Sequence, residues 1–116
     1  MGESRWHLLD RVMTRVAFKM KLFAGYEAEY KRRHAALWPE LAELLKAAGV
    51  RDYSIFLDEE TLILFAYLQV NEPEKLDELR TQAIMWKWWD YMKDIMEVHP
   101  DTSPVTKPLE ELFYMP

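Results

Sequence analysis

The patterned part of the chain opens with an alternation of apolar and polar side chains between residues 15 and 22. Its period of two predicts a β-strand with one buried face. Residues 1–14 precede this strand and are predicted to be an N-terminal extension, to which we assign no catalytic role. The rest of the chain, residues 15–116, has the length of a single domain with one modest core.

A helical pattern follows, from residue 26 to residue 48, and Gly49 comes after it as a typical C-terminal cap. Tyr30 and His34 lie one turn apart on the apolar face of this predicted helix. Pro39 predicts a kink just after His34, because proline cannot donate a hydrogen bond to the preceding turn. Such a kink has two interpretations: it opens a pocket beside the imidazole, or it bends the helix around a sheet.

The remainder of the chain is predicted to hold two apolar strands, two helical stretches and a final strand. Their bounds are 53–58 and 62–70 for the strands, 73–80 and 84–98 for the helices, and 109–115 for the last strand. A polar turn joins the first two strands as a hairpin, and a loop with two prolines, residues 99–104, precedes the final strand. The order of elements predicts an α+β, ferredoxin-like fold, in which helices cover one face of an antiparallel sheet.

The strand at residues 62–70 is apolar at almost every position, so both of its faces should be buried. Two helices cover only one face of a sheet. We therefore predict a homodimer in which two copies pack sheet against sheet about a two-fold axis, forming a dimeric α/β barrel. The alternative is an apolar ligand bound on the uncovered face.

Composition narrows the function further. The chain is 50% hydrophobic and 30% charged, which is ordinary for a soluble globular protein. A net charge of −5 argues against a nucleic-acid partner, and the lack of a long apolar run argues against a membrane partner. The chain contains no cysteine, which excludes a thiolate nucleophile or metal ligand and fits a cytoplasmic location.

Of the three histidines, His7 lies in the extension and His99 in the proline-containing loop, so neither has a positional argument for catalysis. His34 is different, because its spacing places a titratable imidazole among apolar groups. It is either a core histidine, satisfied by a backbone carbonyl or by Tyr30, or the acid–base group of a site.

A second candidate feature is the aromatic stretch at residues 86–92, in which Trp88 and Trp89 are adjacent. Neighbouring residues of a helix lie about 100° apart, so these two rings cannot both face one core. Aromatic faces bind the apolar side of pyranose rings, although the same residues also serve as core and interface fillers. The sequence shows no inward-facing His-x-x-x-His or Glu-x-x-His pair for a metal, no nucleophile elbow and no glycine-rich phosphate loop.

Several separated segments carry a family resemblance that covers roughly residues 15–116. They are residues 29–34, 37–41, 52–58 and 88–92, followed by 100–101, 103–105 and 113–116. In this order they resemble the L-rhamnose mutarotase family. The resemblance implies a dimeric ferredoxin-like fold and an enzyme that interconverts the α and β anomers of L-rhamnose by ring opening and reclosure.

The same resemblance implies roles for five residues. Anomer exchange is expected to need no metal or cofactor. His34 corresponds to the proton donor, and the positions that contact the sugar are Tyr30, Tyr53, Trp88 and Trp89. The base that takes the anomeric proton stays open between water and a carboxylate such as Asp101. The competing function is that of a small oxygenase or an aromatic-ligand-binding protein with the same dimeric fold.

Overall fold

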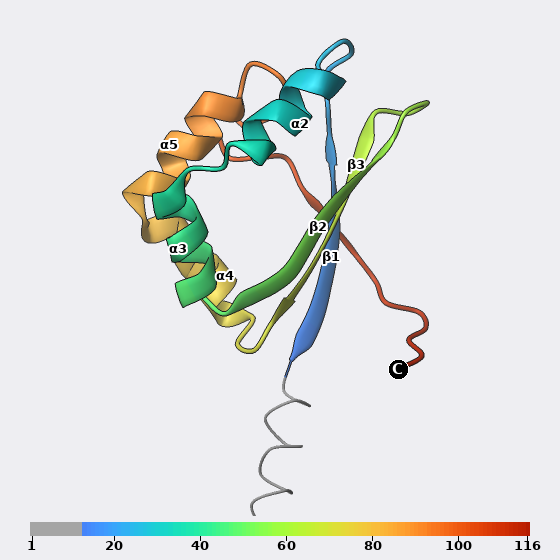
Figure 1. Ribbon diagram of the computed structural model, residues 1–116. Coiled ribbons are helices and arrows are strands. Elements are labelled where there is room, and N and C mark those ends of the chain that lie inside the picture. Colours follow the sequence, from blue (N-terminus) through green and yellow to red (C-terminus); the bar gives the residue numbers. More distant parts are fainter. Residues whose placement is uncertain (1–12) are drawn as a thin grey trace, which may run out of the picture.

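The computed structural model describes residues 13–116, which form one antiparallel sheet of four strands with helices packed on one side (Figure 1). The strands are β1 (Thr14–Lys21), β2 (Val50–Asp58), β3 (Ile63–Val70) and β4 (Lys107–Leu109). They lie in the order β2-β3-β1-β4, and each pairs antiparallel with its neighbour. The predicted α+β, ferredoxin-like fold is confirmed. Residues 1–12, which include His7 and most of the predicted extension, lie outside the described residues.

The helices all pack against the same face of the sheet (Figure 1). They are α2 (Glu27–Ala35), α3 (Pro39–Ala47), α4 (Glu74–Glu78), the short 3₁₀ turn η1 (Leu79–Thr81) and α5 (Ala83–Met92). Within residues 13–116, no helix is long and apolar enough to cross a membrane.

The core lies between this helical layer and the inner face of the sheet. Alternate residues of β3 point into it, and they are no more than 3% exposed: Leu64, Ala66, Leu68 and Val70. The intervening residues point to the other face, where Phe65 of β3 stays 38% exposed and its cross-strand neighbour Phe56 of β2 stays 67% exposed. One chain therefore buries one face of its sheet and leaves the other open.

The prediction of a single helix over residues 26–48 is wrong. The helix ends before Pro39 and a second helix begins there, so Pro39 separates two helices and does not kink one. Trp38 adopts an extended conformation, with φ −60° and ψ 130°, and Pro39 begins α3 as its first residue. A residue before proline is sterically driven out of the helical region, and proline itself suits the first turn of a new helix. α2 has already ended at Ala35, one residue after His34.

The predicted helix over residues 84–98 is also too long. α5 ends at Met92, and the chain then turns so that Met96 pairs with Leu22, just beyond β1. The amide of Glu97 donates to the carbonyl of Lys21 at 2.9 Å. The apolar residues of this segment are buried because they join the end of β1, and not because they continue a helix.

The last strand is misplaced in the sequence-based prediction. β4 covers Lys107–Leu109 instead of residues 109–115, and its Pro108 pairs with Phe18 of β1. The apolar residues beyond it stay outside regular structure, with Leu112 at 87% and Phe113 at 80% exposure. Alternating apolar character predicts a strand only where a neighbouring strand is available to pair with it.

Candidate functional site

His34 lies in the last turn of α2, where the backbone fixes one of its two ring nitrogens. Nδ1 lies 3.0 Å from the carbonyl oxygen of Tyr30, one turn earlier. Because a carbonyl only accepts hydrogen bonds, Nδ1 must carry the proton and donate it. This bond leaves Nε2 as the nitrogen that gains or releases a proton.

Two aromatic rings enclose the imidazole on different sides. The ring of Tyr30 stacks on it, with centroids 4.3 Å apart and planes inclined by 27°. Trp88 of α5 meets it edge-on, with centroids 5.3 Å apart and an interplanar angle of 89°. The fold thus brings together three of the five residues that the sequence singled out, from two helices far apart in the chain.

Two further rings complete what we call the His34 cluster: Tyr30, His34, Trp38, Trp88 and Tyr91. Trp38 lies 5.1 Å from Trp88 and 5.4 Å from Tyr91, between ring centroids, and Trp88 lies 5.6 Å from Tyr91. Trp38 reaches this position because it lies in the break between α2 and α3. Aromatic pairs at these distances stabilise a defined arrangement beyond the area they bury.

Burial sets the protonation of the cluster. Desolvation lowers the pKa of His34, and its hydrogen bond to the Tyr30 carbonyl opposes this only in part. Burial, followed by the nearby phenol of Tyr53, raises the pKa of Tyr30 above its ordinary value. The neutral imidazole and the neutral phenol are therefore the stable forms at neutral pH.

Tyr53 approaches this cluster from the sheet, where β2 carries a bulge. The pairing of β2 with β3 shifts register between Arg51 and Ser54, and Asp52 has a positive φ of 50°. Tyr53 keeps 40% of its surface exposed, yet burial raises the pKa of its phenol to about 12. The desolvated part of the side chain is thus its hydroxyl end. A bulge is a common way to redirect a side chain next to a functional site.

Trp89 lies apart from the His34 cluster. Its ring meets Trp86 edge-on at 4.7 Å, and the guanidinium of Arg80 lies over it at 5.6 Å. The adjacent tryptophans of α5 thus face two neighbourhoods, as their 100° separation on a helix predicts.

Asp101, in the loop before β4, accepts hydrogen bonds from the hydroxyl and amide of Ser103, and these bonds lower the pKa of its carboxyl group.

Sequence reasoning missed two residues here, Arg33 and Trp38. Arg33 follows Glu29 by four residues, a spacing at which opposite charges meet on a helix, so its ion pair had a readable signal. The sequence carried no signal for the burial of Arg33 or for its contacts with α5.

Within residues 13–116, His, Asp and Glu side chains do not gather in a group of three or more that could hold a metal ion.

An imidazole with one free nitrogen, held between aromatic rings on an α+β ferredoxin-like scaffold, is suited to the acid–base chemistry of a small enzyme. Comparison with known proteins makes the assignment specific. A family model described as L-rhamnose mutarotase matches residues 15–115. The chain belongs to the L-rhamnose mutarotase family.

Individual relatives cover nearly the same stretch. The L-rhamnose mutarotase of Bacteroides thetaiotaomicron is 57% identical over 103 residues, which is 89% of this chain and 99% of that protein. The crystal structure of an L-rhamnose mutarotase from Formosa agariphila superposes with a TM-score of 0.83 at 55% identity, covering 89% of this chain and 99% of that one. A conserved protein from Methanosarcina mazei, 15% identical with a TM-score of 0.61 over 90% of this chain and 98% of that one, shares the fold alone.

Proposed function

We propose that this protein interconverts the α and β anomers of L-rhamnose. The observation that carries the proposal is the His34 imidazole with its free Nε2, enclosed by Tyr30 and Trp88 in a chain of the L-rhamnose mutarotase family. Anomer exchange requires a proton on the ring oxygen, loss of the proton of the anomeric hydroxyl, rotation of the open-chain aldehyde, and reclosure. Positioned side chains suffice for this chemistry.

His34 is the proton donor in this proposal, and it acts through Nε2. Protonated Nε2 gives its proton to the ring oxygen as the ring opens and recovers one on reclosure. Because burial lowers the pKa of His34, its imidazolium is a stronger acid than an exposed one. Above its pKa, His34 is mostly neutral, and the protonated form that donates to the ring oxygen is the minor one. The contribution of His34 to the rate should therefore fall as pH rises through the pKa of His34.

The other four residues hold the sugar in this proposal. Trp88 contacts the apolar side of the ring and the C6 methyl group, while Tyr30 and Tyr53 bind hydroxyl groups with phenols that remain neutral. Because Trp88 is 6% and Tyr30 8% exposed, their contact with the sugar is confined to the margins of their rings. Trp89 lies in its own neighbourhood beside Arg80, so its contact with the sugar rests on the family resemblance alone. The base that takes the anomeric proton is water or the carboxylate of Asp101.

The test is to dissolve a single anomer of L-rhamnose and follow its approach to equilibrium by polarimetry or saturation-transfer NMR. We expect His34→Asn to lower kcat/KM by about 10²- to 10⁴-fold, the range of a lost acid–base group. His99→Asn makes the same change in an exposed loop and should keep wild-type activity. Failure of the wild-type protein to accelerate equilibration would overturn the function, and a fully active His34→Asn would make His34 structural.

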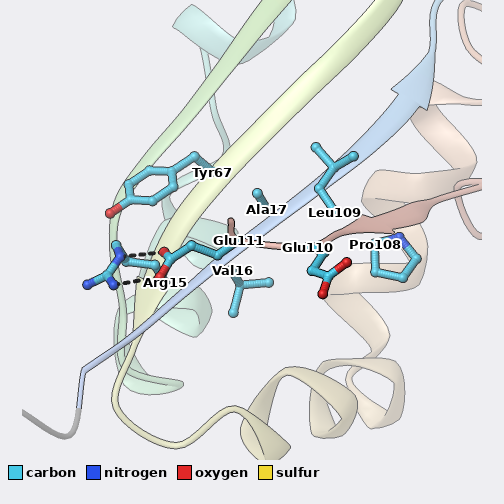
Figure 2. Close-up of a pocket in the computed structure, with 8 residues that line it drawn as sticks. All are labelled: Arg15, Val16, Ala17, Tyr67, Pro108, Leu109, Glu110 and Glu111. Atoms are coloured by element: carbon cyan, nitrogen blue, oxygen red, sulfur yellow. Dashed lines mark hydrogen bonds and ion pairs between the residues drawn. The ribbon is translucent and has the colours of Figure 1, made fainter. Parts of the chain in front are cut away.

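The homodimer is also part of the proposal. The open sheet face carries Phe56 and Phe65, and the C-terminal segment adds four exposed apolar residues: Leu112, Phe113, Tyr114 and Met115. On this face a pocket of about 290 Å³ lies between β1, β3 and the segment after β4 (Figure 2). The ion pair of Arg15 with Glu111, at 2.7 Å, fixes that segment across the face.

A second copy packed on this face would shield Phe56 and Phe65 from water, which supports a sheet-to-sheet dimer over an isolated chain. The alternative occupant is an apolar ligand on the same face.

We also propose a cytoplasmic location, supported by the absence of cysteine from the sequence.

A further inference from the structure

Arg33 is a charged residue that the fold buries. Its side chain is 9% exposed, whereas that of its neighbour Arg32 is 63% exposed. A buried guanidinium is costly unless its donors are satisfied, so its partners show which parts of the fold it holds together.

The partners of Arg33 come from α2, from α5 and from the turn that follows α5. Nε donates to Glu29 of α2 at 2.7 Å, within the same helix. Nη1 and Nη2 form a two-pronged pair with the carboxylate of Asp94, at 2.9 and 3.1 Å. Nη1 also donates to the carbonyl oxygen of Tyr91 at 2.7 Å. Arg33 thus joins α2 to the C-terminal end of α5.

The hydrogen bond from Arg33 gives the carbonyl oxygen of Tyr91 a donor that α5 itself does not supply. The last carbonyls of a helix have no partner within it, and a positive charge at that end interacts favourably with the helix dipole. Lysine could supply the charge, but only the planar fork of arginine reaches the Tyr91 carbonyl and both oxygens of Asp94 together.

The same guanidinium also touches the His34 cluster. It lies over the ring of Tyr91, with Cζ 4.4 Å from the centroid. Tyr91 packs against Trp88 at 5.6 Å, and Trp88 meets the His34 imidazole at 5.3 Å. A short chain of contacts therefore runs from Arg33 through Tyr91 and Trp88 back to His34.

We propose that Arg33 is a positioning residue for the reaction: by tying the end of α5 to α2, it sets the placement of Trp88 against His34. The inference rests on the proposed catalytic role of His34. The guanidinium of Arg33 is held by Glu29, Tyr91 and Asp94, so Arg33 acts through geometry and does not exchange protons with the sugar. Displacements of about 1 Å at a catalytic group lower rates by up to about 10²-fold.

The experiment compares Arg33→Met and Arg33→Lys with a matched control, Lys93→Met. Lys93 forms an exposed ion pair with Asp90 at 2.8 Å near the same end of α5, so its loss removes one positive charge without touching the cluster. Kinetics on L-rhamnose anomers are combined with NMR spectra of the His34 ring, assigned by the signals absent from His34→Gln. The geometric readout is the nuclear Overhauser contact between the rings of His34 and Trp88.

We expect Arg33→Met to lower kcat about 10- to 100-fold with a smaller change in KM, and to weaken the contact between the two rings. Arg33→Lys should recover part of both, because it keeps the charge but not the fork, and Lys93→Met should match the wild type. If Arg33→Met does not fold, Asp94→Asn removes one prong of the pair at an exposed carboxylate and should weaken the ring contact with a smaller loss of kcat.

Two results would overturn the inference: undiminished kcat in Arg33→Met, or a reduced kcat with the ring contact unchanged. The ring contact is measured without activity. If His34 proves not to be the proton donor, the spectra still report whether Arg33 places Trp88, so the two failures are distinguishable.

Discussion

In the last turn of α2, the backbone holds Nδ1 of His34 and leaves Nε2 free. Its inward position could be predicted from helical spacing with Tyr30. The edge-on contact with Trp88 could not, because it depends on how two helices pack across the core. Spacing predicted that Trp88 and Trp89 face different sides of α5, but it could not show that the neighbour of Trp89 is Arg80.

The lowered pKa of His34 should make the stability of the protein depend on pH. The unfolded chain has a histidine pKa of about 6.5, and the folded value is lower, so between the two values the unfolded state binds more protons. Stability contributed by His34 is therefore fully present above about pH 6.5 and is lost as pH falls toward the folded pKa.

We expect the free energy of unfolding, measured by urea denaturation between about pH 7 and pH 5, to fall less steeply in His34→Gln than in the wild type. Parallel curves for the two proteins would contradict the assignment of this pH dependence to His34.

At the scale of elements, the start of β2 depends on how α3 ends. Gly49 has a φ of 85° and lies against the side chain of Asn71, so that a Cβ built there would fall 2.1 Å from Oδ1. The glycine cap was predicted from the sequence, and it is correct. The true start of β2 at Val50 was missed, because the polar residues before Tyr53 and the bulge obscure the alternation on which strand prediction relies.

We expect Gly49→Ala to destabilise the protein by about 1–2 kcal/mol, since a side chain at positive φ is strained. Gly25→Ala is the matched control, because Gly25 has a φ of 88° with open space around its Cβ position. The difference between the two variants in urea denaturation isolates the displacement of Asn71. A Gly49→Ala protein as stable as Gly25→Ala would mean that Asn71 moves aside freely.

At the scale of the whole molecule, the three long strands and a helical layer on one face followed from patterning, and the family from motifs spread along the chain. The C-terminal end did not follow, because the apolar residues 112–115 have no strand to pair with in one chain. Rules based on hydrophobic patterning assume that an apolar residue is buried within its own chain. The open sheet face and the apolar C-terminal residues do not meet this assumption.

We expect the wild-type protein to run as a dimer in size-exclusion chromatography with light scattering, and Phe56→Asp to shift it to the monomer, since a charge would then be buried in the sheet-to-sheet contact. Phe23→Asp is the control, because Phe23 is also exposed, at 42%, but lies beyond the end of β1, outside the paired strands of the sheet. A monomeric wild type would favour the apolar ligand instead.

The edges of the sheet govern how far such association continues. β4 offers only three residues at one edge, and one of them, Pro108, has no amide hydrogen to give to an incoming strand. Strands from other molecules therefore find little to pair with at this edge. In the proposed dimer, contact through the open sheet face would close after two copies. Growth along the edge, the route to fibrils, would be limited on the β4 side by the short proline-bearing strand.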